Sequence, residues 1–169
     1  EYKIQKNLET DQKFGIGFNG EIFNIRFGLF SKTELTALDG SIIPAGGLIE
    51  TAAPDEDGFM CFAADMPYNA ECYIKELETD EHYILSNEQY LNGDTVKNKI
   101  IRGSIEGLKT DPKGRVLRGA VIGLFYPFET EFSADTAIET FETDEAGRFS
   151  FENVPYGDWI IRELKAPDG

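Results

Sequence analysis

An all-β protein of two tandem β-sandwich domains is the fold class that this sequence predicts. The chain of 169 residues contains 13 Phe and 7 Tyr, and Phe, Ile, Thr and Tyr recur in short runs typical of strands. Glycine and proline interrupt these runs often, and no long stretch has the spacing of an amphipathic helix. An internal repeat divides the chain into two parts, each long enough to bury a modest core.

The repeat is clearest in two stretches of alternating pattern. Residues 72–80 resemble the stretch of residues 159–169, and each stretch carries a glutamate, Glu76 or Glu163, on the same face as apolar neighbours. Residues 49–58 also match residues 138–147 without a gap. We therefore expect a first domain over residues 1–102 and a second over residues 103–169.

Strands are expected in order along both parts. In the first, a turn-rich connection follows the opening strand, a polar insertion precedes residue 48, and an acidic turn at residues 55–58 predicts a hairpin. The expected strands there are residues 2–6, 25–30, 48–51, 59–62, 73–77, 83–85 and 96–101. In the second part they are residues 104–109, 120–126, 138–141, 148–151 and 159–164. Only the first part has a strand after its glutamate stretch, so we expect the natural protein to continue past Gly169.

The formal charge of −15 limits the possible partners. Nucleic-acid binding needs clustered Lys and Arg to neutralise phosphates, and docking on anionic lipid needs the same charge. No apolar run reaches membrane-spanning length, and no signal-peptide pattern opens the chain. We therefore expect no nucleic-acid partner and no membrane insertion in this fragment.

Sites for conventional catalysis or metal binding are scarce in the sequence. The single histidine, His82, lies among Asp80, Glu81 and Tyr83 and indicates a turn more than a catalytic centre. The acidic turns lack the spacing of a calcium loop, and no zinc ligand set or phosphate-binding loop is present. Cys61 and Cys72 are expected on opposite faces, which disfavours a disulfide. We expect no cofactor, no metal and no turnover of a free substrate.

Glu76 and Glu163 are unusual because each shares a face with apolar residues. If that face is the core, desolvation favours the neutral carboxylic acid. If the glutamate stands at the strand end instead, it reaches water. The pattern alone leaves both interpretations open.

Several motifs together resemble the Cna protein B-type domain, a family that includes the SpaA-like pilin domains of Gram-positive surface proteins. They include an opening Lys, a Gly-Leu-Phe strand, the run Asp-Glu-Ala-Gly-Arg-Phe-Ser-Phe, and the stretch from Arg162 to Gly169. The second domain matches over most of its length, whereas the first is more divergent after Glu76. The resemblance implies a small transthyretin-like, or reversed immunoglobulin-like, β-sandwich.

The resemblance also implies a chemistry. Many family members join a first-strand Lys to a last-strand Asn or Asp through an isopeptide bond that a buried Glu promotes. Carried over to this chain, the residues of the first domain are Lys6, Glu76 and Asn98, although Asn98 could instead be a solvated linker residue. In the second domain Lys109 and Glu163 match, and their partner would lie beyond Gly169. Glu50 imitates the family motif but aligns with a mid-domain strand, so we do not expect it to act.

Two functions follow from this resemblance. The first is a structural stalk or shaft module of a cell-wall-anchored adhesin or pilin, in contact with neighbouring domains of the same surface protein. The alternative is a ligand-binding adhesin module that recognises a host protein or glycan through residues 33–47 and 128–135, since loops on rigid sandwiches often carry recognition. Extracellular localisation, a signal peptide and sortase anchoring are expected from the family, outside this fragment.

Overall fold

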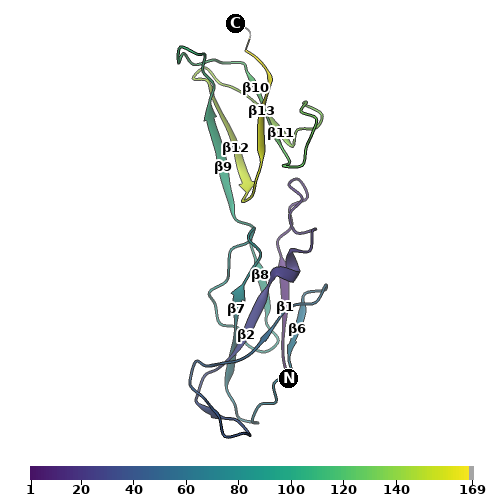
Figure 1. Ribbon diagram of the computed structural model, residues 1–169, viewed down its shortest axis with the longest axis vertical. Helices are drawn as coiled ribbons and strands as arrows, with labels where there is room; N and C mark the ends of the chain where they lie inside the picture. Colours follow the sequence, from purple (N-terminus) through teal and green to yellow (C-terminus); the bar gives the residue numbers. More distant parts are fainter. Residues whose placement is uncertain (168–169) are drawn as a thin grey trace. The chain divides into compact units, whose positions relative to one another are not determined.

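The computed structural model describes residues 1–167 and consists almost entirely of β-strands (Figure 1). The chain divides into two compact units. The first comprises Glu1–Asp11 and Gly15–Ile100, and the second comprises Gln12–Phe14 and the chain from Ile101 onward. The all-β class that the sequence predicts is confirmed.

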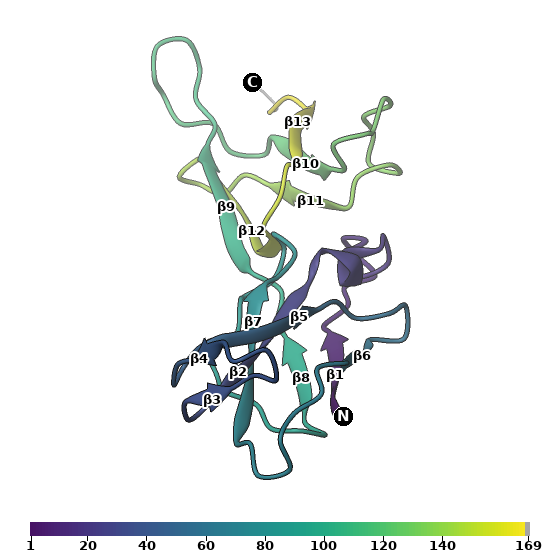
Figure 2. The same ribbon diagram turned by 60° about the horizontal axis from the view of Figure 1, so that its bottom comes forward.

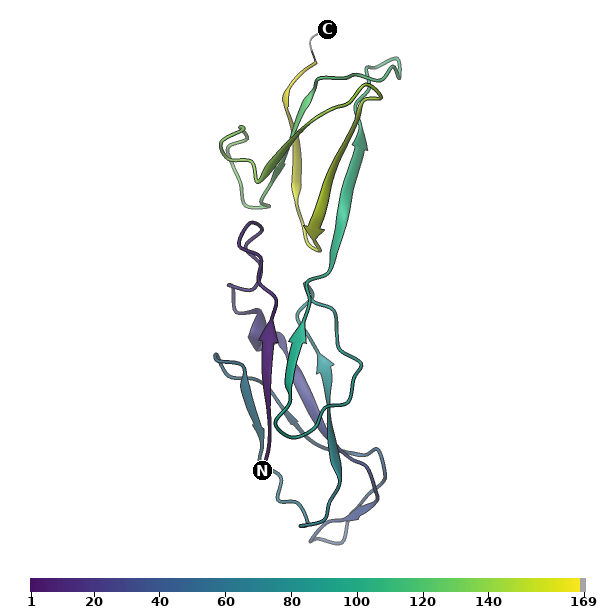
Figure 3. The same ribbon diagram turned by 180° about the vertical axis from the view of Figure 1, so that it is seen from behind.

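Two three-stranded sheets form the first unit, with the orders β6-β1-β8 and β5-β2-β7. Their strands are β1 (Tyr2–Leu8), β2 (Arg26–Ser31), β5 (Leu48–Ala52), β6 (Phe59–Phe62), β7 (Cys72–Glu78) and β8 (Thr95–Asn98). The first strand is central in its sheet: β6 pairs with it antiparallel and β8 pairs with it parallel. Figure 3 shows β1 and β8 running side by side. The first and last strands of this unit are therefore neighbours.

The core of the first unit lies between these sheets and follows the alternation of each strand. Apolar side chains from both sheets pack into one cluster, which includes Ile4, Phe27, Phe62, Ile74 and Val96. Because side chains alternate across a strand, the residues two positions from these also face inward. This rule directs Lys6 and Glu76 into the core beside Ile4 and Ile74.

The hairpin between β5 and β6 turns back at Gly58, next to β1. Gly58 has a φ of +81°, a conformation that favours glycine, and its carbonyl accepts a hydrogen bond of 2.7 Å from the Lys6 amide. A Cβ atom at Gly58 would clash with the carbonyl oxygen of Lys6. This turn therefore fixes the backbone at Lys6 by close approach.

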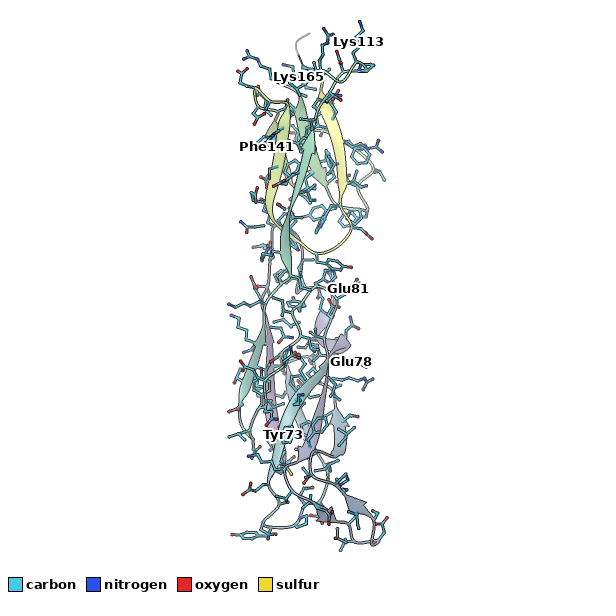
Figure 4. All side chains as sticks on the ribbon, turned by 90° about the vertical axis from the view of Figure 1, so that its left-hand side faces the viewer. Tyr73, Glu78, Glu81, Lys113, Phe141 and Lys165 are labelled. Atoms are coloured by element: carbon cyan, nitrogen blue, oxygen red, sulfur yellow. The ribbon has the colours of Figure 1, made fainter. Side chains whose placement is uncertain are left out.

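The second unit contains the sheets β12-β9 and β11-β10-β13. Their strands are β9 (Arg102–Leu108), β10 (Val121–Phe125), β11 (Glu139–Glu142), β12 (Arg148–Pro155) and β13 (Ile160–Lys165). In Figure 4, Phe141 marks β11 and Lys165 marks the end of β13. The order β11-β10-β13 corresponds to β5-β2-β7 in the first unit, and Glu163 lies opposite Ile122 as Glu76 lies opposite Phe27.

Some local expectations are wrong. Residues 83–85 form no strand, because Tyr83 makes only an isolated bridge to Ile100. The polar insertion folds into a small hairpin of β3 (Leu35–Thr36) and β4 (Ile42–Ile43), seen in Figure 2. A short 3-10 helix, Glu21–Asn24, lies in the turn-rich connection. Asp168 and Gly169, the end of the motif that begins at Arg162, lie outside the described residues.

Candidate functional site

Lys6, Glu76 and Asn98 meet inside the first unit. They come from β1, β7 and β8, and the parallel register of β1 with β8 sets Leu8 opposite Asn98. Lys6 Nζ lies 2.6 Å from Glu76 Oε1, and Asn98 Nδ2 donates to both Glu76 oxygens at 2.9 Å. The structure thus brings together three residues that are 70 and 22 positions apart in the sequence.

The three side chains are almost fully shielded from water. Lys6 is 1% exposed, Glu76 3% and Asn98 2%. The Lys6 ammonium position also lies 5.5 Å from the centre of the Phe27 ring. Burial lowers the pKa of Lys6 below its usual value, although the hydrogen bond and charge of Glu76 act in the opposite direction. The site therefore favours an uncharged, nucleophilic amine more than water would.

The two oxygens of Glu76 have different partners. Oε1 faces Lys6, whereas Oε2 accepts a 2.7 Å hydrogen bond from the Ser86 backbone N–H. The segment that carries Ser86 is held by Tyr90, whose backbone pairs with Ile74 and whose hydroxyl contacts the Ser86 hydroxyl. In addition to Asn98, each oxygen thus has its own second donor, Lys6 at Oε1 and the Ser86 N–H at Oε2. Sequence reasoning missed Ser86, since a backbone donor has no side-chain signature.

The amide of Asn98 is held on one side only. Its Nδ2 also donates to the Thr79 hydroxyl at 3.1 Å, whereas Oδ1 is buried and has no hydrogen-bond partner among the described residues. A buried carbonyl oxygen without a partner is uncommon and destabilises a fold by about 1–3 kcal/mol. The unsatisfied atom is the one on which charge develops when a nucleophile attacks the amide carbon.

The second unit has a related pair but a different environment. Lys109 Nζ lies 2.6 Å from Glu163 Oε2, and the two side chains are 31% and 33% exposed. Glu163 is thus neither sealed in a core nor fully solvated. In the part of the chain that the structure describes, no Asn or Asp side chain is hydrogen-bonded to this pair. The Lys109–Glu163 pair has no equivalent of Asn98 there.

The remaining candidates serve local structure. Both Glu50 oxygens accept backbone N–H bonds from Ala63 and Ala64, which places Glu50 at the end of β6 and away from the three-residue site. His82 Nδ1 lies 2.6 Å from the buried Asp80. Cys61 is exposed and Cys72 is buried, and neither forms a disulfide. Within residues 1–167 there is no cluster of three potential metal ligands and no helix with the length and apolar character of a membrane span.

Comparisons with known proteins show which families and folds this chain is similar to. Residues 103–169 match the family model of the SpaA prealbumin-like fold domain. The TIE protein of Bacillus anthracis is similar over 99% of this chain, with a TM-score of 0.58 and 20% identity; this chain spans 28% of that protein chain. The C-terminal fragment of the pilus adhesin SpaC from Lactobacillus rhamnosus GG is similar over 99% of this chain and 76% of its own, with a TM-score of 0.55 and 14% identity.

The second unit therefore resembles the SpaA prealbumin-like fold domain, and the two solved structures share the β-sandwich fold over nearly the whole chain. The resemblance seen in the motifs of the second domain is confirmed by the family match. No curated protein matches the chain. The tandem arrangement of two copies stays a prediction, which the similar strand orders of the two units support.

Proposed function

We propose that this chain is a structural module of a cell-surface adhesin or pilin whose first unit cross-links itself through a Lys6–Asn98 isopeptide bond promoted by Glu76. The observation that carries the proposal is that Lys6 and Asn98 both contact the Glu76 carboxyl group inside a buried core. A lysine, a carboxyl group and a carboxamide in contact are the reactants and the proton carrier of amide exchange. Burial lowers the pKa of Lys6, which favours the neutral amine that the exchange needs.

The reaction conserves atoms and protons. In the buried pair a proton passes from the Lys6 ammonium to Glu76 Oε1, which leaves a neutral amine and a neutral acid. Lys6 Nζ then attacks Cγ of Asn98, and a bond forms between them. Glu76 relays a proton from Nζ to Nδ2, the Cγ–Nδ2 bond breaks, and ammonia leaves. Glu76 ends protonated, and no oxidant, reductant or metal is required.

The position of the bond suits a stalk or shaft. β1 and β8 are the first and last strands of the first unit and lie side by side in one sheet. A covalent link between Lys6 and Asn98 would join the first and last strands of the unit directly. Force applied at the two ends of the unit could then not separate these strands. A buried ion pair alone is weak evidence for stability, whereas a covalent link restricts the unfolded chain.

The intact mass of the purified chain tests this proposal. We expect the parent protein to be lighter than its sequence by one ammonia and Glu76→Gln to have its full mass, because glutamine cannot carry the proton. Glu78→Gln is the matched control: Glu78 is an exposed residue at the other end of β7 from Tyr73 (Figure 4), and its variant should lose ammonia like the parent. A parent of full mass would contradict the cross-link.

Placement on a Gram-positive cell surface is part of the same proposal. It is supported by the SpaA family match and by the fold shared with a fragment of a pilus adhesin. Neighbouring domains of the same surface protein are the partners that this role requires. Immunogold labelling of intact cells with antibodies against this chain should decorate the cell surface, and label confined to the cell interior would contradict the placement.

A second candidate function, recognition of a host ligand, is favoured by one observation. Phe128 is 75% exposed and stacks on Tyr126, with ring centres 5.1 Å apart and planes within 7°. This stacked pair presents an apolar face at the start of residues 128–135. Binding of the chain to a glycan microarray that is lost in Phe128→Ala would support this role, and equal signals for both proteins would contradict it.

A further inference from the structure

Thr79 brings a hydroxyl group to the amide that would react. β7 ends at Glu78, so the strand that carries Glu76 also delivers Thr79 directly after its last residue. Asn98 Nδ2 donates to Thr79 Oγ1 at 3.1 Å. In the second unit the residue three positions after Glu163 is Ala166, which has no hydroxyl. The contact with Thr79 is thus particular to the site of the first unit.

The hydrogen bonds of Asn98 are unevenly distributed. Nδ2 contacts both the Glu76 carboxyl group and the Thr79 hydroxyl, whereas Oδ1 is buried with no partner in the described chain. Attack by Lys6 places negative charge on Oδ1 and not on Nδ2. A half turn of the amide about its Cβ–Cγ bond exchanges the two atoms and sets Oδ1 where Nδ2 now lies.

The Thr79 hydroxyl is suited to both orientations of this amide. A hydroxyl has one proton to donate and lone pairs to accept, so it can accept from Nδ2 or donate to Oδ1. The ionised Glu76 carboxylate can only accept hydrogen bonds. It can donate one to Oδ1 only after it has taken the proton of Lys6. Once protonated, Glu76 and Thr79 would be two donors on one carbonyl oxygen.

We propose that Thr79 is a fourth residue of the cross-linking site, whose hydroxyl accepts from the Asn98 amide in the resting site and donates to the Asn98 carbonyl oxygen as Lys6 attacks. The inference rests on the isopeptide reaction proposed above. Thr79 keeps its proton throughout, so the balance of that reaction is unchanged. In the tetrahedral intermediate, rotation about Cβ–Cγ brings Nδ2 back to Glu76, which then gives it the relayed proton. As the Cγ–Nδ2 bond breaks and ammonia leaves with its electron pair, an electron pair on Oδ1 re-forms the carbonyl double bond.

The rate of bond formation tests the role of Thr79. The chain is made by cell-free synthesis, samples are quenched in acidic denaturant at intervals, and the fraction that has lost ammonia is read from the intact mass. We expect Thr79→Val to slow the loss at least about tenfold, because removal of one donor at a developing oxyanion commonly slows catalysis by more than that. Thr79→Ser should stay within about threefold of the parent, since it keeps the hydroxyl.

Controls separate this inference from the proposed cross-link and from folding. Thr95→Val removes an exposed threonine hydroxyl on β8 and should react like the parent. In a Lys6→Met background, which cannot react, circular dichroism should show Thr79→Val folded; Thr79→Ala replaces it if valine does not pack. A parent that loses no ammonia overturns both proposals, whereas a reactive parent matched in rate by a folded Thr79 variant overturns the role of Thr79 alone.

Discussion

At the scale of single residues, the three-residue site combines groups that are unfavourable in a core when alone. A buried lysine and a buried carboxylate each lose their hydration. The free-energy cost of that loss can exceed what their mutual attraction contributes. Lys6 and Glu76 offset this by direct contact at 2.6 Å, and Asn98 with the Ser86 N–H supplies further donors to Glu76. The close contacts that make these groups tolerable in the core would also hold them in place for the proposed reaction.

Gly58 is a residue at which one methyl group should have a large effect. Gly58→Ala combines an unfavourable φ of +81° with a clash against the Lys6 carbonyl. We expect it to lower the free energy of unfolding by about 2 kcal/mol or more and to slow ammonia loss, because β1 must shift. Gly93→Ala is the control, since Gly93 has a φ of +90° and open space around it. Equal losses for the two variants, measured by urea unfolding, would show that the clash is relieved without cost.

Asp80 should make the first unit sensitive to acid. Burial opposes its ionisation, but hydrogen bonds from Asn24 and His82 lower its pKa below the usual value of 3.8. A group whose pKa is lower in the folded state adds stability above its unfolded pKa and loses it as the pH falls through the folded pKa. The difference in unfolding free energy between the parent and Asp80→Asn should therefore be present at pH 7 and shrink below pH 3.8. A difference that does not change with pH would contradict this.

At the scale of elements, the parallel pairing of β1 with β8 determines which strands the proposed cross-link would join. The pairing brings Lys6 and Asn98 into one sheet, while Glu76 reaches them from β7 in the facing sheet. The hairpin turn at Gly58 supports β1 from its other side through the bond to the Lys6 amide. Each reacting group is thus held by a different strand, and the site exists only when both sheets have packed.

The length of chain between the linked strands sets the expected stabilisation. The bond would close a loop of 98 − 6 = 92 residues. By the chain-entropy estimate used for disulfides, a loop of that length stabilises the fold by about 4–5 kcal/mol. The parent should therefore unfold at higher denaturant than Asn98→Ala, which keeps the Lys6–Glu76 pair. Leu91→Ala, at an exposed residue outside the site, should unfold close to the parent. Equal midpoints for the parent and Asn98→Ala would contradict a covalent link.

At the scale of the whole molecule, the division into two units makes the first a testable domain. The boundary between the units follows Ile100, close to the domain boundary proposed from the repeat. We expect a fragment of residues 1–102 to fold and to lose one ammonia, because its three reacting residues and both of its sheets lie within it. Far-UV circular dichroism and intact mass measure this together. An unfolded fragment of full mass would show that the second unit is needed.

The formal charge of −15 also acts on the whole chain. Mutual repulsion of like charges destabilises a compact state, and dissolved salt screens it over about 8–10 Å at physiological ionic strength. We expect the thermal midpoint of the chain to rise with added sodium chloride from 10 to 200 mM. A midpoint that falls over this range would mean that attractive ion pairs outweigh the repulsion.

The sequence by itself determined the all-β class of the fold and the alternation of side chains along each strand. Period-two alternation directs Ile4 and Lys6 to one face of their strand, and the repeat marks Glu76 as the counterpart of Glu163. The same rule placed Cys61 outside and Cys72 inside, as the structure has them. These features follow from local geometry, because successive side chains of a strand point to opposite faces regardless of which strand it pairs with.

Only the tertiary structure decided how the groups are partnered. Thr79 and the Ser86 N–H reach the site because segments distant in sequence meet there, and no local pattern marks a backbone donor or a hydroxyl beside a turn. The sequence pattern is the same around Glu76 and Glu163, so it could not predict that Glu76 is buried and Glu163 is partly exposed. Burial, unlike strand direction, depends on what other segments cover a residue, and that is determined when the sheets pack.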